Sequence, residues 1–218
     1  MIKENTQNIL RSLPPGVELV AATKERSTAQ IKEAMAGGVR IIGENYIKEA
    51  QEKFAILGSS IKWHLIGYLQ KNKAVKAVKM FDMIETLDSL SLAAIIDKEC
   101  KKINKVMPVL IEVNSAGESQ KQGLLIENVE PFVQKILQLT NLKPMGLMTM
   151  GPWLEQTEEI RPFFRKTKDL FIRIKDNYRE KLEWIYLSMG MSTSYQIAIE
   201  EGANLVRLGT AIFGPRKY

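Results

Sequence analysis

The sequence predicts an α/β protein whose parallel sheet closes into a (β/α)8 barrel of the TIM type. Short apolar runs alternate strictly with amphipathic stretches, eight such pairs fit into 218 residues, and no linker, repeat or low-complexity tract divides the chain. Strict alternation is typical of parallel strands joined by helices, and eight units of this length suit a small closed barrel. We therefore expect one domain over residues 1–218.

Eight apolar runs are predicted as the strands, at residues 17–22, 39–42, 61–66, 80–85, 106–113, 142–147, 184–187 and 204–208. A doubly wound open sheet is the alternative arrangement. No G-x-G-x-x-G segment follows the first run, so the open sheet lacks its usual nucleotide-binding signal.

The helices are predicted from apolar residues spaced three and four apart. The first follows a cap at Ser27 or Thr28 and ends at Gly37 and Gly38. Further helices are expected at 45–57, 70–79, 127–139 and 155–176. Asp88 is expected to cap a helix that buries Leu92 and Cys100, and Ser192 one that ends at Gly202.

Composition excludes several classes of protein. Hydrophobic residues make up 45% of the chain, enough for a folded core. The single cysteine, Cys100, cannot form an internal disulfide, and one histidine with one cysteine argues against a transition-metal site. No apolar run approaches membrane-spanning length, and the polar start lacks the apolar centre of a signal peptide. A cytoplasmic protein without a membrane span is expected.

The net charge of +6 has two interpretations. The lysines of residues 71–79 and 101–105 either form a solvated surface or bind an anionic partner. A nucleic-acid-binding barrel is therefore one alternative function. Aromatic residues do not interleave with the lysines of 71–79, which counts against stacking on single strands. No specific nucleic acid is expected.

Lys24 is the most informative single residue, because it closes the first apolar run. Barrel proteins place function at the C-terminal ends of their strands. A desolvated lysine amine loses its charge more readily and is the nucleophile that condenses with carbonyl compounds. The alternative is a lysine that extends its ammonium group to solvent at a strand end.

Small residues and hydroxyl groups follow the last two strands. The chain reads Ser188-Met-Gly-Met-Ser192 and then Arg207-Leu-Gly209-Thr210, in the two loops where barrels often bind phosphate. Ser192 also suits a helix start, where an anion is favoured. Ser192 as a simple helix cap and Gly209 as a turn residue remain the alternative. A reactive lysine and a phosphate site at one barrel mouth together indicate an aldehyde that carries a phosphate.

Two more charged or titratable residues lie in predicted strands. Arg207 interrupts an apolar run and needs a partner, either a ring nitrogen or a carboxylate such as Glu112. The single histidine, His64, suits an acid–base role, although a lone histidine is more often structural.

At these residues the sequence resembles the pyridoxal phosphate homeostasis family, single-barrel relatives of the N-terminal domain of alanine racemase. The similar segments are VAATKERS, IGENYIKEAQEK, WHLIGYLQKNK, EVNSAGESQKQGL, GLMTMGP and LSMGMSTSYQIAIEEGANLVRLGTAIFG. They span residues 19–214 in the order typical of the family.

The resemblance implies pyridoxal 5'-phosphate as the cofactor and a role for each matched residue. Lys24 would hold it as an internal aldimine, Asn45 and His64 would lie around the ring, and Arg207 would face the pyridine nitrogen. Phosphate contacts are implied for Ser188, Gly209 and Thr210, together with Ser192. An arginine cannot give up its proton to the ring nitrogen, which makes the ring a weaker electron sink.

The resemblance implies a carrier that controls free pyridoxal 5'-phosphate rather than an enzyme, so no catalytic residue is assigned. The chain ends soon after its eighth strand, and racemases need a second domain to supply another base. An amino-acid racemase or decarboxylase is the alternative. The expected partners are the cofactor and the apo forms of enzymes that use it, and the expected state is a monomer.

Overall fold

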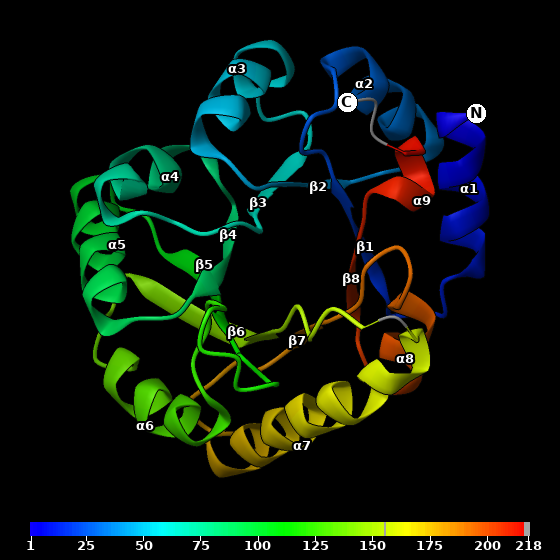
Figure 1. Ribbon diagram of the computed structural model, residues 1–218. Coiled ribbons are helices and arrows are strands. Elements are labelled where there is room, and N and C mark those ends of the chain that lie inside the picture. The colour runs from blue at the N-terminus through cyan, green and yellow to red at the C-terminus, as the bar shows by residue number, and fades with distance from the viewer. Residues whose placement is uncertain (155, 216–218) are drawn as a thin grey trace.

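The computed structural model of the protein describes residues 1–154 and 156–215. Within them, eight parallel strands close in chain order into a barrel, and β8 pairs back onto β1 (Figure 1). The predicted (β/α)8 barrel is confirmed. The strands are β1 (Glu18–Ala22), β2 (Ile41–Glu44), β3 (Lys62–Leu65), β4 (Met83–Leu87), β5 (Met107–Glu112), β6 (Leu142–Met148), β7 (Tyr186–Ser188) and β8 (Leu205–Leu208).

Helices form a ring outside the strands (Figure 1). They are α1 (Ile2–Ser12), α2 (Thr28–Gly37), α3 (Ile47–Leu57), α4 (Ala74–Met80), α5 (Leu90–Lys102), α6 (Ile126–Ile136), α7 (Arg161–Asn177), α8 (Tyr195–Glu200) and α9 (Thr210–Phe213), with 3-10 turns η1 (Lys71–Lys73) and η2 (Thr157–Ile160). None of the helices in the described ranges has the length and apolarity that a bilayer span requires.

The hydrophobic core has two parts, because each strand is buried on both faces. The larger part lies between the strands and the helices and includes Trp63 and Phe164. The smaller part fills the barrel and includes Val20, Met83 and Leu205. Strands buried on both faces explain why the sequence shows continuous apolar runs rather than alternation.

The N-terminal helix α1 was not among the predicted elements. Ile2, Ile9 and Leu10 pack against the outer core, and Thr6 is fully buried. Contact with α2 is close, since a Cβ on Gly37 would come within 2.7 Å of the Thr6 Cβ. A helix with so few apolar residues gains its stability from packing, which local sequence does not reveal.

The start of α2 follows the prediction, whereas the starts of two other helices do not. Ser27 caps α2 in a reciprocal pair with Gln30, and Gly38 ends it in the left-handed region. The cap residue of α5 is Ser89 rather than Asp88. The helix predicted from residue 155, which lies outside the described residues, begins only at Arg161, after η2.

Candidate functional site

The C-terminal ends of the parallel strands meet at one rim of the barrel, where such folds place their functional groups. The predicted site residues lie at this rim or just below it. Lys24 follows β1, Asn45 follows β2, His64 lies in β3, Ser188 ends β7, Ser192 lies between β7 and α8, Arg207 lies in β8, and Gly209 and Thr210 lead into α9.

Four buried side chains form a polar row across the barrel interior. His64 Nδ1 lies 2.7 Å from Glu85 Oε1. The Ser188 hydroxyl donates to Glu85 Oε2 at 2.6 Å and accepts from Arg207 Nη1 at 2.6 Å. Arg207 Nη2 donates to the Thr149 carbonyl oxygen at 2.9 Å. These groups from β3, β4, β7 and β8 satisfy one another, as burial requires.

Opposite charges balance within the polar row. Burial raises the pKa of Glu85, but the hydrogen bond and charge of His64 and the charge of Arg207 outweigh it and hold that pKa below its ordinary value. Burial also lowers the pKa of Arg207, and the charges of Glu85 and Glu112 oppose this. Arginine stays protonated even so, so the barrel interior holds a fixed guanidinium.

Lys24 lies at the rim and is partly shielded from solvent. Its side chain is 23% exposed, and its Nζ lies 5.0 Å from the centre of the Tyr46 ring and 3.8 Å from Glu25 Oε1. Lys24 lies two residues beyond the end of β1, whose Val20 and Ala22 side chains pack in the barrel interior. Its amine therefore lies near an aromatic face and keeps some exposure to solvent.

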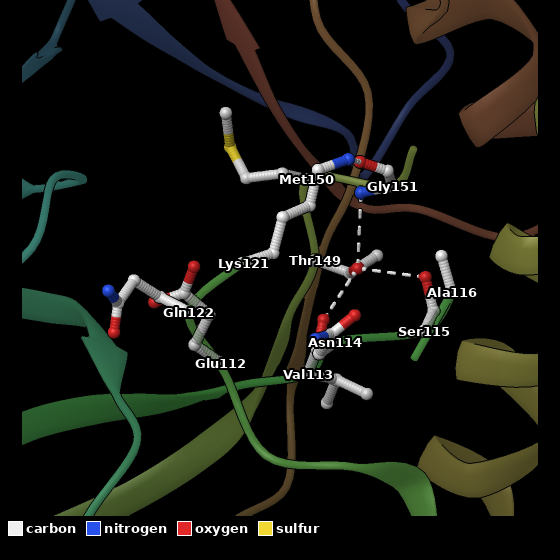
Figure 2. Close-up of a pocket in the computed structure, with 10 residues that line it drawn as sticks. All are labelled: Glu112, Val113, Asn114, Ser115, Ala116, Lys121, Gln122, Thr149, Met150 and Gly151. Carbon is white, nitrogen blue, oxygen red and sulfur yellow. Dashed lines mark hydrogen bonds between the residues drawn. The ribbon is translucent and has the colours of Figure 1, made fainter. Parts of the chain in front are cut away.

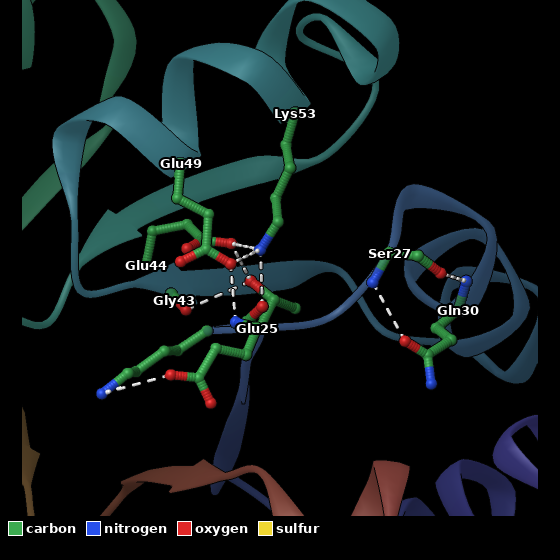
Figure 3. Close-up of polar contacts among 9 residues, drawn as sticks. Glu25, Ser27, Gln30, Gly43, Glu44, Glu49 and Lys53 are labelled. Carbon is green, nitrogen blue, oxygen red and sulfur yellow. Dashed lines mark hydrogen bonds and ion pairs between the residues drawn. The ribbon is translucent and has the colours of Figure 1, made fainter. Parts of the chain in front are cut away.

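The turn that carries Lys24 is held on both sides by helix α3 (Figure 3). Lys53 Nζ donates to the Thr23 carbonyl oxygen at 2.6 Å. The Glu25 N–H donates to Glu49 Oε1 at 2.6 Å. Glu25 has a φ of 61°, which is uncommon for a residue other than glycine, so these contacts hold an unfavoured backbone conformation next to Lys24.

Glu44, Glu49 and Lys53 form a cluster that we call the turn clamp (Figure 3). Lys53 Nζ lies 2.5 Å from Glu44 Oε1 and 2.8 Å from Glu49 Oε1, and Thr23 Oγ1 donates to Glu44 Oε1 at 2.5 Å. Burial raises the pKa of Glu44 despite the attraction of Lys53. Glu44 Oε2 is buried without a hydrogen-bond partner among the described residues. The clamp is thus a desolvated ion cluster behind Lys24.

Ser192 joins the β7 loop to the start of α9. The prediction that Ser192 caps the next helix is wrong, because α8 begins at Tyr195 with Ser194 as its cap residue. Ser192 Oγ instead accepts hydrogen bonds from the N–H groups of Gly209 at 3.2 Å and Ala211 at 3.1 Å. Because the oxygen accepts both, its own hydroxyl proton can be donated to an anion at the rim.

Ser188 has a different environment from the one that the predicted phosphate contact requires. Its side chain is fully buried, its single proton is donated to Glu85, and it accepts from Arg207. Donation to a phosphate would break the bond to Glu85. The structure thus places Ser188 with Arg207, while Ser192 lies with Gly209.

A pocket of about 240 Å³ adjoins the rim at the ends of β5 and β6 (Figure 2). Thr149 organises it, since its hydroxyl donates to the Val113 carbonyl at 2.8 Å and accepts from the Gly151 N–H at 3.3 Å. Glu112 and Lys121 also line the pocket. We call this cavity the mouth pocket.

Glu112 brings a titrating group to the mouth pocket. Burial raises its pKa to about 7, the charge of Asp88 adds to the shift, and Arg207 opposes it. The sequence suggested Glu112 as the carboxylate partner of Arg207. The structure assigns that place to Glu85, which reaches Arg207 through Ser188.

Sequence reasoning missed Glu85 and Lys53. Glu85 lies inside an apolar strand, as Arg207 does. A charged residue within an apolar run is a signal that could have identified Glu85 as a candidate site residue. Lys53 could not be distinguished from other helical lysines, because only the fold shows that it is buried. Within the described ranges, no group of three or more His, Cys, Asp or Glu is placed to hold a metal ion.

Known proteins with a similar sequence support the assignment of a family. Residues 1–217 match the model of the alanine racemase N-terminal domain. The chain is 41% identical over 202 residues to the pyridoxal phosphate homeostasis protein of Aquifex aeolicus, covering 92% of this chain and 88% of that one. It is 37% identical to the protein of that name from Mus musculus, covering 92% and 77%.

Solved structures show the same relationship. PipY of Synechococcus elongatus, determined with pyridoxal 5'-phosphate bound, has a TM-score of 0.90 and 32% identity over 98% of this chain and 100% of PipY. An alanine racemase of Clostridium difficile, at 16% identity and a TM-score of 0.81, shares the fold over 57% of its own length. The chain belongs to the alanine racemase N-terminal domain family and, within it, to the pyridoxal phosphate homeostasis proteins.

Proposed function

We propose that this protein binds pyridoxal 5'-phosphate at the barrel rim and holds it reversibly on Lys24. The observation that supports the proposal is the position of Lys24 directly after β1 at the rim, on a turn whose flanking backbone is held by Lys53 and Glu49 of the turn clamp. When bound, the cofactor supplies an aldehyde that condenses with a primary amine and releases water. PipY, which shares the fold at 32% identity, has been determined with this cofactor.

The donor set at the rim fits the remaining parts of the cofactor. Ser192, whose oxygen accepts from the N–H groups of Gly209 and Ala211, can donate its hydroxyl proton to a phosphate, and the N–H of Thr210 at the start of α9 is a second donor. Arg207 is fixed by Ser188 and Thr149, so it can face a ring nitrogen without moving. Asn45 at the rim and His64 in the polar row complete the set of residues that we assign to the cofactor site.

Arg207 favours a carrier over an enzyme in this proposal. A guanidinium does not give its proton to a ring nitrogen, so the ring stays a weak electron sink and carbanion chemistry is disfavoured. We therefore assign no catalytic residue. The protein would bind the cofactor, buffer its free level and release it.

The raised pKa of Glu112 favours the alternative function, an amino-acid racemase or decarboxylase. A carboxyl group with a pKa of about 7 at the mouth pocket suits proton transfer near neutral pH. Exchange of the α-hydrogen of amino acids in D2O distinguishes the two functions. We expect no turnover across a broad amino-acid panel, and rapid exchange that Glu112→Gln abolishes would establish the enzyme.

The attachment site is tested by borohydride fixation followed by peptide mapping. We expect the label on Lys24, together with a visible absorbance band that borohydride removes. Lys24→Ala and Lys24→Arg should lack both, since neither side chain provides a primary amine. Lys121→Ala, which alters a lysine of the mouth pocket, should keep both. A label on another lysine in the unmodified protein would contradict the assignment.

We also propose a role for the protein in the cell. We take residues 1–218 as one cytoplasmic, monomeric domain that delivers the cofactor to apo enzymes and binds no specific nucleic acid or membrane. Protein loaded with pyridoxal 5'-phosphate should activate an apo enzyme faster than the same amount of free cofactor does when that cofactor is released slowly into solution. The rate of activation should fall when a dialysis membrane separates the two proteins. Equal rates for mixed and separated proteins would contradict delivery by direct contact.

A further inference from the structure

A second and larger cavity adjoins the rim near the ends of β2 and β3. Its volume is about 690 Å³, within the range of small-molecule sites. It is formed by the start of α3 and the segment that joins β3 to α4. Tyr46 borders it, and the ring of Tyr46 also contacts Lys24. The cavity is thus a neighbour of the cofactor lysine, although Lys24 does not line it.

The cavity carries uncompensated positive charge. Lys48, Lys73 and Lys76 line it, and none of its described lining residues is acidic. None of the three lysines forms an ion pair within the described residues, and Lys76 Nζ donates only to the neutral Gln51 at 3.2 Å. Glu49, the acid in the first turn of α3, is occupied by Lys53 and the Glu25 N–H. Such a cavity attracts an anion.

Two tyrosines give the cavity aromatic walls. Tyr46 is 55% exposed and Tyr68 is 52% exposed, and they come from neighbouring loops. The loops touch because Gly67 has no side chain, since a Cβ there would lie 2.4 Å from the Asn45 carbonyl oxygen. Exposed tyrosines in a concave site suit stacking on a planar ring, and Gln51 and Gln70 add amide donors and acceptors.

We propose that this cavity binds a phosphorylated ligand of nucleotide size. Lys48, Lys73 and Lys76 would hold the phosphate groups, and the tyrosines would contact the ring. Asn45, which we assign to the cofactor site, also lines this cavity, so the two sites adjoin. The proposed ligand is distinguished from the cofactor by the three lysines, none of which belongs to the site around Lys24. It also accounts for part of the chain's excess of basic residues.

Calorimetric titration with ADP tests the site, on cofactor-free protein and on protein whose Lys24 has been fixed to pyridoxal 5'-phosphate with borohydride. We expect ADP to bind in both states. The double variant Lys48→Gln, Lys73→Gln should weaken binding at least about tenfold, or about 1.4 kcal/mol. The matched control Lys98→Gln, Lys101→Gln removes two exposed charges on α5 and should bind as the unmodified protein does.

The ring contact has its own test. Tyr68→Ala should weaken ADP binding severalfold and leave inorganic pyrophosphate binding unchanged. Failure of both ADP and pyrophosphate to bind, or equal weakening by the two double variants, would overturn the proposal. Failure of the proposed cofactor function would give a different result. The borohydride-fixed label would be lost, whereas ADP would still bind to the cofactor-free protein.

Discussion

Ser188 and Ser192 lie in one short loop, yet their hydroxyl groups have different partners. Gly190 turns the chain between them with a φ of 89°, and a Cβ there would come within 2.6 Å of the Ala198 Cβ. This turn leaves Ser188 inside the barrel with Glu85 and Arg207 and brings Ser192 to the N–H groups of Gly209 and Ala211.

We predict that Ser192→Ala weakens the binding of pyridoxal 5'-phosphate about tenfold and leaves that of pyridoxal, which has no phosphate, nearly unchanged. A hydrogen bond to a charged group contributes about 1.5–3 kcal/mol, enough for this effect. Dissociation constants for both compounds, measured from absorbance, give the comparison.

Ser188→Ala is the control for that prediction, because it removes a hydroxyl from the polar row rather than from the rim. We expect it to act on both compounds alike. If Ser188→Ala instead selectively weakens the phosphorylated compound, Ser188 and not Ser192 holds the phosphate.

At the scale of elements, helix α3 positions a turn that belongs to another unit of the barrel. Lys53 and Glu49 reach from α3 to the backbone on either side of Lys24. Lys53 is 6% exposed and Glu44 is fully buried, so the turn clamp is little screened by water. The position of Lys24 therefore depends on the contacts of α3 with the turn that follows β1 and with Glu44 of β2.

Lys53→Met is expected to lower the free energy of unfolding by about 3 kcal/mol, since removing one partner of a buried ion cluster leaves the other charge uncompensated. It should also slow covalent attachment of the cofactor to Lys24, because the Thr23 carbonyl loses its anchor. Urea denaturation and the rate of borohydride-fixed labelling, measured on folded protein, report the two effects.

Lys32→Met on the exposed surface of α2 is the matched control and should change neither quantity. Lys53→Arg keeps the charge and should recover part of the labelling rate. A normal labelling rate in folded Lys53→Met would show that the clamp stabilises the fold without positioning Lys24.

Across the whole molecule, the barrel interior holds both apolar and charged side chains. Val20, Met83 and Leu205 belong to its apolar cluster, whereas Glu85, Glu112 and Arg207 are buried charged groups on the same strands or on neighbouring ones. Two carboxyl groups near one guanidinium make the stability of the cofactor-free barrel depend on pH.

The raised pKa of Glu112 predicts a loss of stability as pH rises. The folded state holds this proton up to about pH 7, whereas the unfolded chain releases it near 4.5. Below the pKa that Glu112 has in the unfolded chain, this residue makes its full contribution to the stability of the folded state. The contribution is lost as pH rises through the pKa that Glu112 has in the folded state. Glu112→Gln should remove a decline of up to about 3 kcal/mol between about pH 4.5 and pH 7, the unfolded and folded pKa values of this group.

Urea denaturation of the two proteins across that interval tests the prediction. Glu85 does not interfere, because its lowered pKa makes its contribution disappear only in more acidic solution, as pH falls through that value. A constant difference in unfolding free energy between Glu112→Gln and the unmodified protein would contradict a titration of Glu112 near pH 7.

The barrel and the strand ends that form its rim could be predicted from the order of residues alone. Apolar runs alternating with amphipathic stretches have a local physical cause, since each strand and each helix must bury its own apolar surface. For the same reason the sequence located Lys24 and Arg207, which stand out as charges at the end of, or inside, apolar runs.

The pairing of the polar groups, in contrast, is visible only in the folded molecule. Ser188 bonds to Glu85 although 103 positions separate them, and Arg207 bonds to Thr149 across 58 positions. The folded molecule also shows that α1 packs against α2 and that Lys53 is buried. Such pairings depend on which strands face one another across a closed barrel, and residue spacing along the chain carries no record of that.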